Sequence, residues 1–331
     1  MAPTMRALAQ DRYGPPVEVL QLRELPTPRP GPGQVLLQVT GAALNPFDWH
    51  VTTGTPYFMR LLFGLRGPGR AIRGADVVGR VLALGDGVTG PPIGARVAGI
   101  AIGSFAEIAL ADPSRLAVVP DSLTDADAAA LPMAGVTALL AVRGHGRVAA
   151  GQRVLVVGAG GGVGGYAAQL AVAAGAEVVG VCGTANVDLV RSYGVSRVID
   201  HTRGSWAEDA AYDVILDAVG TASLRACRRA LRPGGSYVMI GGPKANPWLD
   251  PLTRIVAGPV VFARGSRRFR QFTAAATTAD LALLMDEVVA GRLRPVVTRR
   301  IALPEVPAAL AAFATGRARG KVVVDIAGAP S

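Results

Sequence analysis

The chain has 331 residues, more than one hydrophobic core usually holds, so we expect two domains. Half of the residues are hydrophobic and 18% are charged, which excludes intrinsic disorder, and no apolar run is long enough to predict a membrane span. The net charge is +10, but only Lys244 and Lys321 are lysines and the arginines are spread along the chain. We therefore expect a small-molecule substrate rather than a nucleic-acid or membrane partner.

The N-terminus and the cysteines indicate an intracellular protein. The first ten residues contain no apolar core followed by a small-residue cleavage site, so we expect a cytoplasmic location. Cys182 and Cys227 are the two cysteines, and neither belongs to a CxxC motif or to a Cys/His cluster. They are interpreted as reduced, structural thiols.

The first part of the chain, residues 1–123, is predicted to form a compact β-rich domain. Short apolar runs at 35–39, 77–84 and 106–110 are separated by Gly and Pro, which is typical of short antiparallel strands. A helix over 125–142 is expected to connect this domain with the next.

Strands alternate with alanine-rich helices in residues 124–295, which predicts βαβ units and a parallel sheet. The expected strands are 153–157, 177–181, 212–216 and 236–240, and the expected helices are 163–173 and 187–193. Residues 296–331 end in a strand over 321–326 that is predicted to return to the first domain. The overall expectation is an α/β chain whose doubly wound parallel sheet is flanked in sequence by a β-rich domain.

A glycine-rich turn lies between the first predicted strand and helix of this second part. It comprises Gly158, Gly161, Gly162, Val163 and Gly164 in the spacing GxxGxxG. A pyrophosphate can approach backbone N–H groups at a helix N-terminus only where no Cβ intervenes, and the helix dipole favours its negative charge. Because strand, turn, helix and second strand follow within a short span, the turn predicts a dinucleotide site.

The end of the second strand bears on the choice between NAD and NADP. An acidic residue there would bind the ribose 2′-hydroxyl of NAD, and none is present. Thr184 and Asn186 stand there instead, with side chains that can hydrogen-bond a 2′-phosphate, and Gly183 allows the backbone to come close to it. We therefore expect NADPH, with NADH as an alternative.

Several ordered motifs resemble the medium-chain dehydrogenase/reductase superfamily, and within it the zinc-free quinone oxidoreductase branch. The motifs are Asn45-Pro-Phe-Asp48, Gly74-Ala-Asp76-Val-Val-Gly79, Gly103-Ser-Phe-Ala-Glu107, Leu131-Pro-Met-Ala-Gly135-Val-Thr137, the glycine-rich turn, Tyr212-Asp-Val-Ile-Leu-Asp217, Leu231-Arg-Pro-Gly-Gly235 and Gly320-Lys321. The resemblance covers nearly the whole chain. It implies a GroES-like catalytic domain, a Rossmann NAD(P)-binding domain and a homodimer.

The resemblance also implies roles for single residues. It places Asn45 beside the nicotinamide ribose, Asp48 in the same loop and Thr137 at the nicotinamide end. It places His201 against the adenosine, where relatives often carry a tyrosine, and assigns Gly241 and Lys321 to the cofactor. Relatives often carry Lys or Arg near residues 185–187 to bind the 2′-phosphate. This chain has Ala185 and Val187 there, so Arg203, Arg317 or Arg319 are alternative sources of positive charge.

Zinc ligands are not expected. A catalytic zinc needs about three protein ligands, usually Cys, His or carboxylate. Members that use zinc carry the first ligand cysteine near residue 45, where this chain has Asn45, and His50 is the only histidine before residue 145. Carbonyl polarisation by hydrogen bonds suits the reduction of an enone or quinone better than the oxidation of a simple alcohol.

Two further side chains are candidate proton donors. His50 has an ordinary pKa near neutrality, and Tyr57 follows a Gly-Thr-Pro turn. For both residues a packing role is the alternative interpretation.

The leading hypothesis is an NADPH-dependent reductase of quinones or α,β-unsaturated carbonyls, in the chemistry of secondary metabolism. One alternative is an NAD(P)-dependent alcohol dehydrogenase. Another is a weakly catalytic cofactor-binding protein that acts through nucleic-acid or protein contacts.

Overall fold

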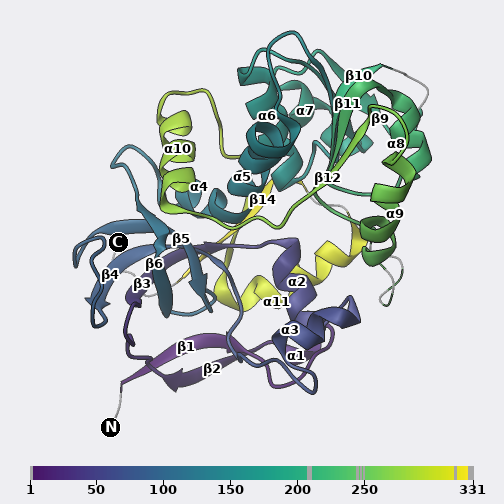
Figure 1. The fold of residues 1–331 in the computed structure, drawn as a ribbon. Coiled ribbons are helices and arrows are strands. Elements are labelled where there is room, and N and C mark those ends of the chain that lie inside the picture. Colours follow the sequence, from purple (N-terminus) through teal and green to yellow (C-terminus); the bar gives the residue numbers. More distant parts are fainter. Residues whose placement is uncertain are drawn as a thin grey trace. The chain divides into compact units, whose positions relative to one another are not determined.

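The computed structural model describes residues 3–206, 211–243, 246, 248, 250–316 and 319–326. The chain forms two compact units (Figure 1). The first comprises Met1–Val136, Ala276–Ala290 and Pro295–Ser331, and the second comprises Thr137–Ala275 and Gly291–Arg294. Among the described residues, no helix combines the length and the apolar character that crossing a bilayer requires.

The first unit is built on a six-stranded sheet with the order β13-β14-β3-β4-β5-β6. A further antiparallel pairing of β3 with β6 closes β3 to β6 into a small barrel. A separate hairpin pairs β1 with β2. The strands are β1 (Thr4–Ala9), β2 (Gln21–Pro26), β3 (Val35–Ala43), β4 (Asp76–Leu84), β5 (Arg96–Ile102), β6 (Ile108–Val118), β13 (Val297–Ala302) and β14 (Lys321–Asp325).

The alternation of side chains explains why β3 lies where it does. Val35, Leu37 and Val39 are buried, while the residues between them are half-buried, as expected when one face of a strand covers a core. The same core receives Phe105 and Val324. The antiparallel β-rich domain expected from the sequence is therefore present.

The last strand joins the first unit, as the sequence predicted. β14 pairs antiparallel with β3, with Val323 opposite Ala43. This pairing brings Lys321 close to residues near position 45, more than 270 positions earlier in the chain. The helices of this unit are α1 (Pro16–Val19), α2 (Pro46–Thr53), α3 (Arg60–Phe63), α4 (Asp125–Ala130), α10 (Thr278–Val289) and α11 (Val306–Ala311).

The second unit contains a six-stranded parallel sheet with the order β12-β11-β10-β7-β8-β9. The chain builds β7, β8 and β9 outward in one direction and then returns to the other side of β7, which is the order of a Rossmann sheet. Its topological switch point lies between β7 and β10. The strands are β7 (Arg153–Val157), β8 (Glu177–Cys182), β9 (Arg197–Asp200), β10 (Tyr212–Asp217), β11 (Leu231–Met239) and β12 (Arg268–Gln271).

The helices α6 to α9 lie in the second unit: α6 (Gly162–Ala173), α7 (Val187–Arg191), α8 (Leu224–Ala230) and α9 (Leu252–Phe262). The predicted strands and the helix after the glycine turn agree with these bounds to within a few residues. The single helix predicted over 125–142 is instead divided into α4, α5 (Pro132–Leu139) and a π-helical turn over Leu140–Gly146. Proline at position 132 lacks the N–H that would continue α4.

Candidate functional site

The glycine-rich turn connects β7 with α6, which begins at Gly162 after the N-cap residue Gly161. Gly158 has φ +85°, a conformation that favours glycine. A Cβ on Gly164 would lie 2.1 Å from the carbonyl oxygen of Gly158, and a Cβ on Gly160 would lie 2.6 Å from the side chain of Asn186. A side chain at Gly158 or Gly164 therefore does not fit unless the backbone of the turn moves.

The turn also has the electrostatic character of an anion site. The first N–H groups of a helix have no acceptor within the helix, and the dipole places partial positive charge there. The first turn of α6 contains no acidic residue. The turn lies at the carboxyl end of β7, beside the switch point, where open α/β sheets bind dinucleotides. Its residues therefore fit a pyrophosphate.

The residues predicted for the adenosine half gather at the ends of β8 and β9. The Thr184 hydroxyl donates a hydrogen bond to Asp200 Oδ2 at 2.6 Å and lies 3.0 Å from the hydroxyl of Thr202. The backbone N–H of His201 donates a hydrogen bond to the carbonyl of Cys182. The imidazole Nε2 of His201 would lie 3.5 Å from a Cβ placed on Gly183. Asn186, Thr184, Gly183 and His201 are therefore close in space, as predicted.

Asp200 is a functional candidate that the sequence did not identify. Hydrogen bonds from Thr184 and Thr202 lower the pKa of its carboxyl to about 2, so it is ionised at neutral pH. Arg203 Nε lies 3.7 Å from its Oδ2. In sequence, an acid that binds the ribose is expected at the end of the second strand, whereas Asp200 ends the third strand and reaches Thr184 through sheet pairing. Arg317 lies outside the described residues.

Gly241 lies beside the turn that follows β10. A Cβ on Gly241 would be 2.3 Å from the carbonyl oxygen of Ala218, and its N–H donates to the carbonyl of Asp217. Thr137 is half-buried in α5.

In the first unit, a buried polar cluster forms around Asn45. Its amide nitrogen donates to Asp76 Oδ2 at 2.9 Å, and its Oδ1 accepts a hydrogen bond from Lys321 Nζ at 2.7 Å. Lys321 also donates to Asp76 Oδ2 at 3.1 Å and to the carbonyl of Leu44 at 3.1 Å. All three N–H donors of its ammonium group thus have acceptors within the cluster, and Lys321 is only 3% exposed. Lys321 therefore fixes the orientation of the Asn45 side chain.

Asp48 adds an ionisable group to this cluster. Its Oδ2 accepts a hydrogen bond from the backbone N–H of Asn45 at 2.8 Å. Burial, followed by the nearby charge of Asp76, raises the pKa of Asp48 to about 7. Asp76 also accepts a hydrogen bond from the backbone N–H of Met133 at 2.9 Å. The structure therefore brings Asn45, Asp48 and Lys321 together around a carboxylate.

His50 and Tyr57 lie in the same unit. His50 Nδ1 is 2.6 Å from the carbonyl oxygen of Thr55, and its ring contacts Trp49 edge-on at 5.0 Å. The guanidinium of Arg60 lies 4.6 Å from the ring centre of Tyr57. Both side chains thus have packing contacts, and a role in catalysis remains a prediction.

A zinc ion does not fit the donors around Asn45. Asp76, the carboxylate that accepts from the Asn45 side chain, is already paired with Lys321, and a dication would have to displace that ammonium group. Burial raises the pKa of Cys182 to about 11 and that of Cys227 to about 12, which disfavours the thiolate that zinc binds. No group of three or more His, Cys, Asp or Glu side chains suited to a metal occurs in the described part of the chain.

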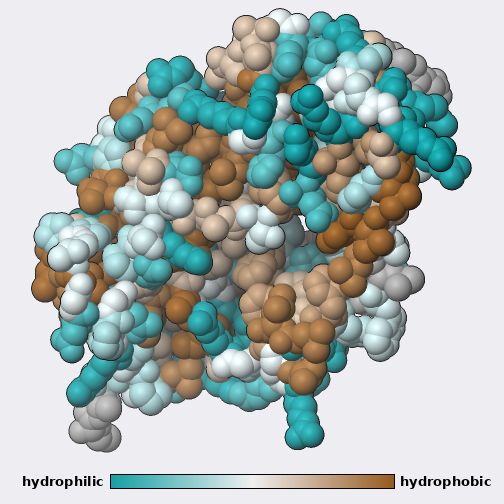
Figure 2. Space-filling view, in the orientation of Figure 1, coloured by the Kyte–Doolittle hydropathy of each residue, from teal (hydrophilic) through white to brown (hydrophobic). Residues whose placement is uncertain are grey.

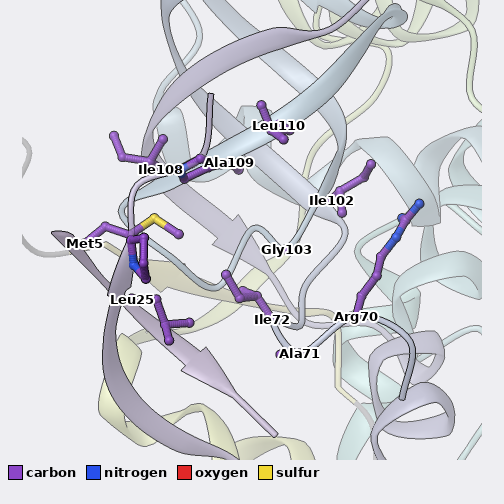
Figure 3. A pocket seen from close by; sticks show the side chains of 12 residues that line it. Met5, Leu25, Arg70, Ala71, Ile72, Ile102, Gly103, Ile108, Ala109 and Leu110 are labelled. Carbon is purple, nitrogen blue, oxygen red and sulfur yellow. The ribbon is translucent and has the colours of Figure 1, made fainter. Parts of the chain in front are cut away.

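The first unit also contains an apolar pocket of about 360 Å³ (Figure 3). Met5, Leu25, Ile72 and Ile108 are among its lining residues, and Arg70 supplies the charged side chain. None of the candidate catalytic or cofactor-binding residues is among the described residues that line it.

Known proteins resemble the chain over nearly its full length. Residues 31–121 match the alcohol dehydrogenase GroES-like domain, and residues 193–324 match the zinc-binding dehydrogenase family. A quinone oxidoreductase of Sus scrofa is 30% identical over 309 residues, which cover 88% of this chain and 89% of that protein. The mitochondrial NAD(P)H oxidoreductase RTN4IP1 of Mus musculus is 31% identical over 332 residues, covering 89% and 82% of the two chains.

The solved structure of the quinone oxidoreductase from Coxiella burnetii superposes with a TM-score of 0.85 at 28% identity. The superposition covers 98% of this chain and 99% of that one. The CurK enoyl reductase, at 21% identity and a TM-score of 0.82, shares the fold. The chain thus belongs to the medium-chain dehydrogenase/reductase superfamily, in its zinc-free quinone oxidoreductase-like branch, and is an oxidoreductase with a GroES-like domain and a Rossmann domain.

Proposed function

We propose that this oxidoreductase uses NADPH, with NADH as an alternative donor, to reduce a quinone or an α,β-unsaturated carbonyl compound. The observation that carries the proposal is the glycine-rich turn from Gly158 to Gly164 at the switch point of a Rossmann sheet, in which Gly158 and Gly164 leave no room for a side chain. The names of the quinone oxidoreductase relatives support the class of acceptor. Secondary metabolism is the proposed setting.

The second unit would hold the cofactor. When bound, the dinucleotide supplies the hydride, so the protein has to bind and orient it. The glycine turn and the first N–H groups of α6 are proposed to bind the pyrophosphate. Gly183, Thr184, Asn186 and His201 are proposed to bind the adenosine half, and Gly241 and Thr137 the nicotinamide half.

The first unit would supply groups for the acceptor. Lys321 and Asp76 hold the carboxamide of Asn45 in one orientation, so this group is preorganised for hydrogen bonding. Asp48 can hold a proton near neutral pH because its pKa is raised to about 7. Reduction of an enone requires a proton as well as a hydride, and we propose Asp48, His50 and Tyr57 as candidates to hold that proton.

The test is the loss of near-ultraviolet absorbance of NADPH and NADH with metal-free protein and a panel of quinones and enones. Turnover without added metal supports the proposal. Turnover only with simple alcohols and the oxidised cofactor, and only after zinc is added, would instead assign an alcohol dehydrogenase.

The homodimer and the cytoplasmic location expected from the sequence belong to the same proposal. Light scattering at working concentration that reports the mass of a single chain would refute the dimer.

A further inference from the structure

A buried network in the second unit connects α9 with the ends of β10 and β11. Asp217 and Tyr237 are fully buried, and Arg254 is 8% exposed. Arg254 Nη2 donates a hydrogen bond to the Tyr237 hydroxyl at 2.6 Å, and that hydroxyl donates to Asp217 Oδ2 at 2.8 Å. Arg254 Nη2 is also 3.6 Å from Asp217 Oδ2. The guanidinium and the carboxylate therefore form a buried ion pair bridged by a phenol.

The network holds the turn that follows β10. Asp217 Oδ1 accepts hydrogen bonds from the backbone N–H groups of Val219 at 3.0 Å and Gly220 at 2.7 Å. Arg254 Nη1 donates to the carbonyl of Ala222 at 2.6 Å. The turn over residues 218–222 is thus fixed at its beginning by Asp217 and at its end by Arg254.

This turn packs directly against the predicted dinucleotide site. In the sheet, Asp217 pairs with Val157, the residue before Gly158. A Cβ on Gly158 would lie 2.6 Å from Val219 Cγ2, and a Cβ on Gly241 would lie 2.3 Å from the carbonyl oxygen of Ala218. A shift of the turn over residues 218–222 by about an ångström would therefore change the space that a ligand can occupy beside Gly158.

The sheet order indicates which half of the cofactor this turn would contact. A Rossmann sheet consists of two mononucleotide-binding halves that meet at the switch point. The predicted adenosine contacts, Thr184 and His201, follow β8 and β9, on one side of β7. The turn over residues 218–222 follows β10, on the other side, and so lies on the nicotinamide side.

We propose that Arg254 is a positioning residue that, through Tyr237 and Asp217, sets the placement of the nicotinamide half of the cofactor. This inference rests on the proposed function, because it requires that the chain bind a nicotinamide dinucleotide. It assigns a role in the reaction to α9, a helix that none of the sequence motifs includes.

The test compares binding of whole NADPH with binding of adenosine 2′,5′-bisphosphate, which lacks the nicotinamide half. Calorimetry is performed on the full-length protein and on Arg254→Met, which keeps the length of the side chain and removes its charge. We expect NADPH to bind about tenfold more weakly or worse in the variant, because hydrogen bonds to a charged group are lost. Affinity for the bisphosphate should stay within about twofold.

Two further variants separate positioning from folding. Tyr237→Phe removes only the bridging hydroxyl, and we expect the same selective loss, of smaller size. Arg232→Met is the matched control, because Arg232 pairs with Asp213 near the opposite end of β10, at 2.9 Å, where it is half-exposed. It should bind both ligands as the unmodified protein does.

Each outcome is decisive for one claim. If the unmodified protein binds NADPH and Arg254→Met binds it equally well, the role of Arg254 is refuted. If the variant loses both ligands in proportion, Arg254 supports the whole domain rather than the nicotinamide half, which also refutes the inference. If the unmodified protein binds neither ligand and does not bind NADH either, it is the proposed function that fails.

Discussion

The hydroxyl of Thr184 donates its hydrogen bond to the carboxylate of Asp200, 2.6 Å away, at the position predicted to meet the adenosine ribose. Because its proton is committed to Asp200, Thr184 can offer only an acceptor to a ligand in this arrangement. A 2′-phosphate needs donors, so Asp200 opposes the NADPH preference that the sequence predicts.

Replacement of Asp200 by Asn is therefore expected to raise the preference for NADPH over NADH. Removal of a negative charge beside a phosphate site should change the ratio of the two kcat/KM values by about three- to tenfold. Asp188→Asn, on the exposed surface of α7, is the control and should leave the ratio unchanged. Thr184→Asp should shift the ratio toward NADH. An unchanged ratio in both Asp200→Asn and Thr184→Asp would show that the 2′ group of the cofactor ribose binds at other residues.

Asp48 should make stability depend on pH. Because its pKa is raised to about 7 in the folded protein, the folded state keeps a proton that the unfolded chain loses near pH 4. The retained proton contributes to the free energy of unfolding fully at low pH, and this contribution is lost as the pH rises to 7. Over this range the free energy of unfolding falls by up to about 1.4 kcal/mol per pH unit. In Asp48→Asn the corresponding decline should disappear from urea unfolding curves measured between about pH 4 and pH 8. An unchanged decline would show that another group causes it.

Lys321 should be needed for folding of the first unit. Lys321→Met leaves the Asp76 carboxylate buried without its cation, so we expect the free energy of unfolding to fall by about 3–5 kcal/mol. Arg300→Met breaks the exposed pair with Asp325 and should cost less than about 1 kcal/mol. In the double variant Lys321→Met/Asp76→Asn, part of the loss should be recovered, because no buried charge remains unpaired. If urea titrations show that the losses of the two single substitutions simply add in the double variant, Lys321 and Asp76 are not an energetically coupled pair.

Gly164 should tolerate no side chain. In Gly164→Ala the new Cβ would meet the carbonyl oxygen of Gly158 at 2.1 Å, so the turn has to move. We expect a loss of about 1–3 kcal/mol in the free energy of unfolding, together with weaker NADPH binding. Gly144→Ala is the control, because no described atom lies within 4 Å of its Cβ position. Equal NADPH affinity in Gly164→Ala and Gly144→Ala would show that the pyrophosphate does not bind at this turn.

Local patterns predicted much of this fold. The strand over Arg153–Val157 and the helix after it follow from a short β-branched run and a glycine-rich junction, and both signals lie within neighbouring residues. The expected helix over 125–142 was wrong as one element, because its alanine-rich composition outweighed the proline at position 132.

Pairings between distant residues could not be predicted in the same way. Lys321 meets Asn45 because β14 pairs with β3, and Asp200 meets Thr184 because β9 pairs with β8. Arg254 reaches Tyr237 from α9, a segment without a recognisable motif. Sequence spacing carries no information about such contacts, so the motifs predicted the glycine-rich turn but not the partners of Lys321, Asp200 and Arg254.

The most direct test of the account is to follow deuterium from NADPH that carries deuterium in both positions at C4 of the nicotinamide into an α,β-unsaturated ketone, using metal-free protein. The account predicts a saturated ketone that carries the label on its β-carbon, detected by mass spectrometry. Reduced product without deuterium, or formation of labelled product only after zinc is added, would contradict direct hydride transfer in a zinc-free site.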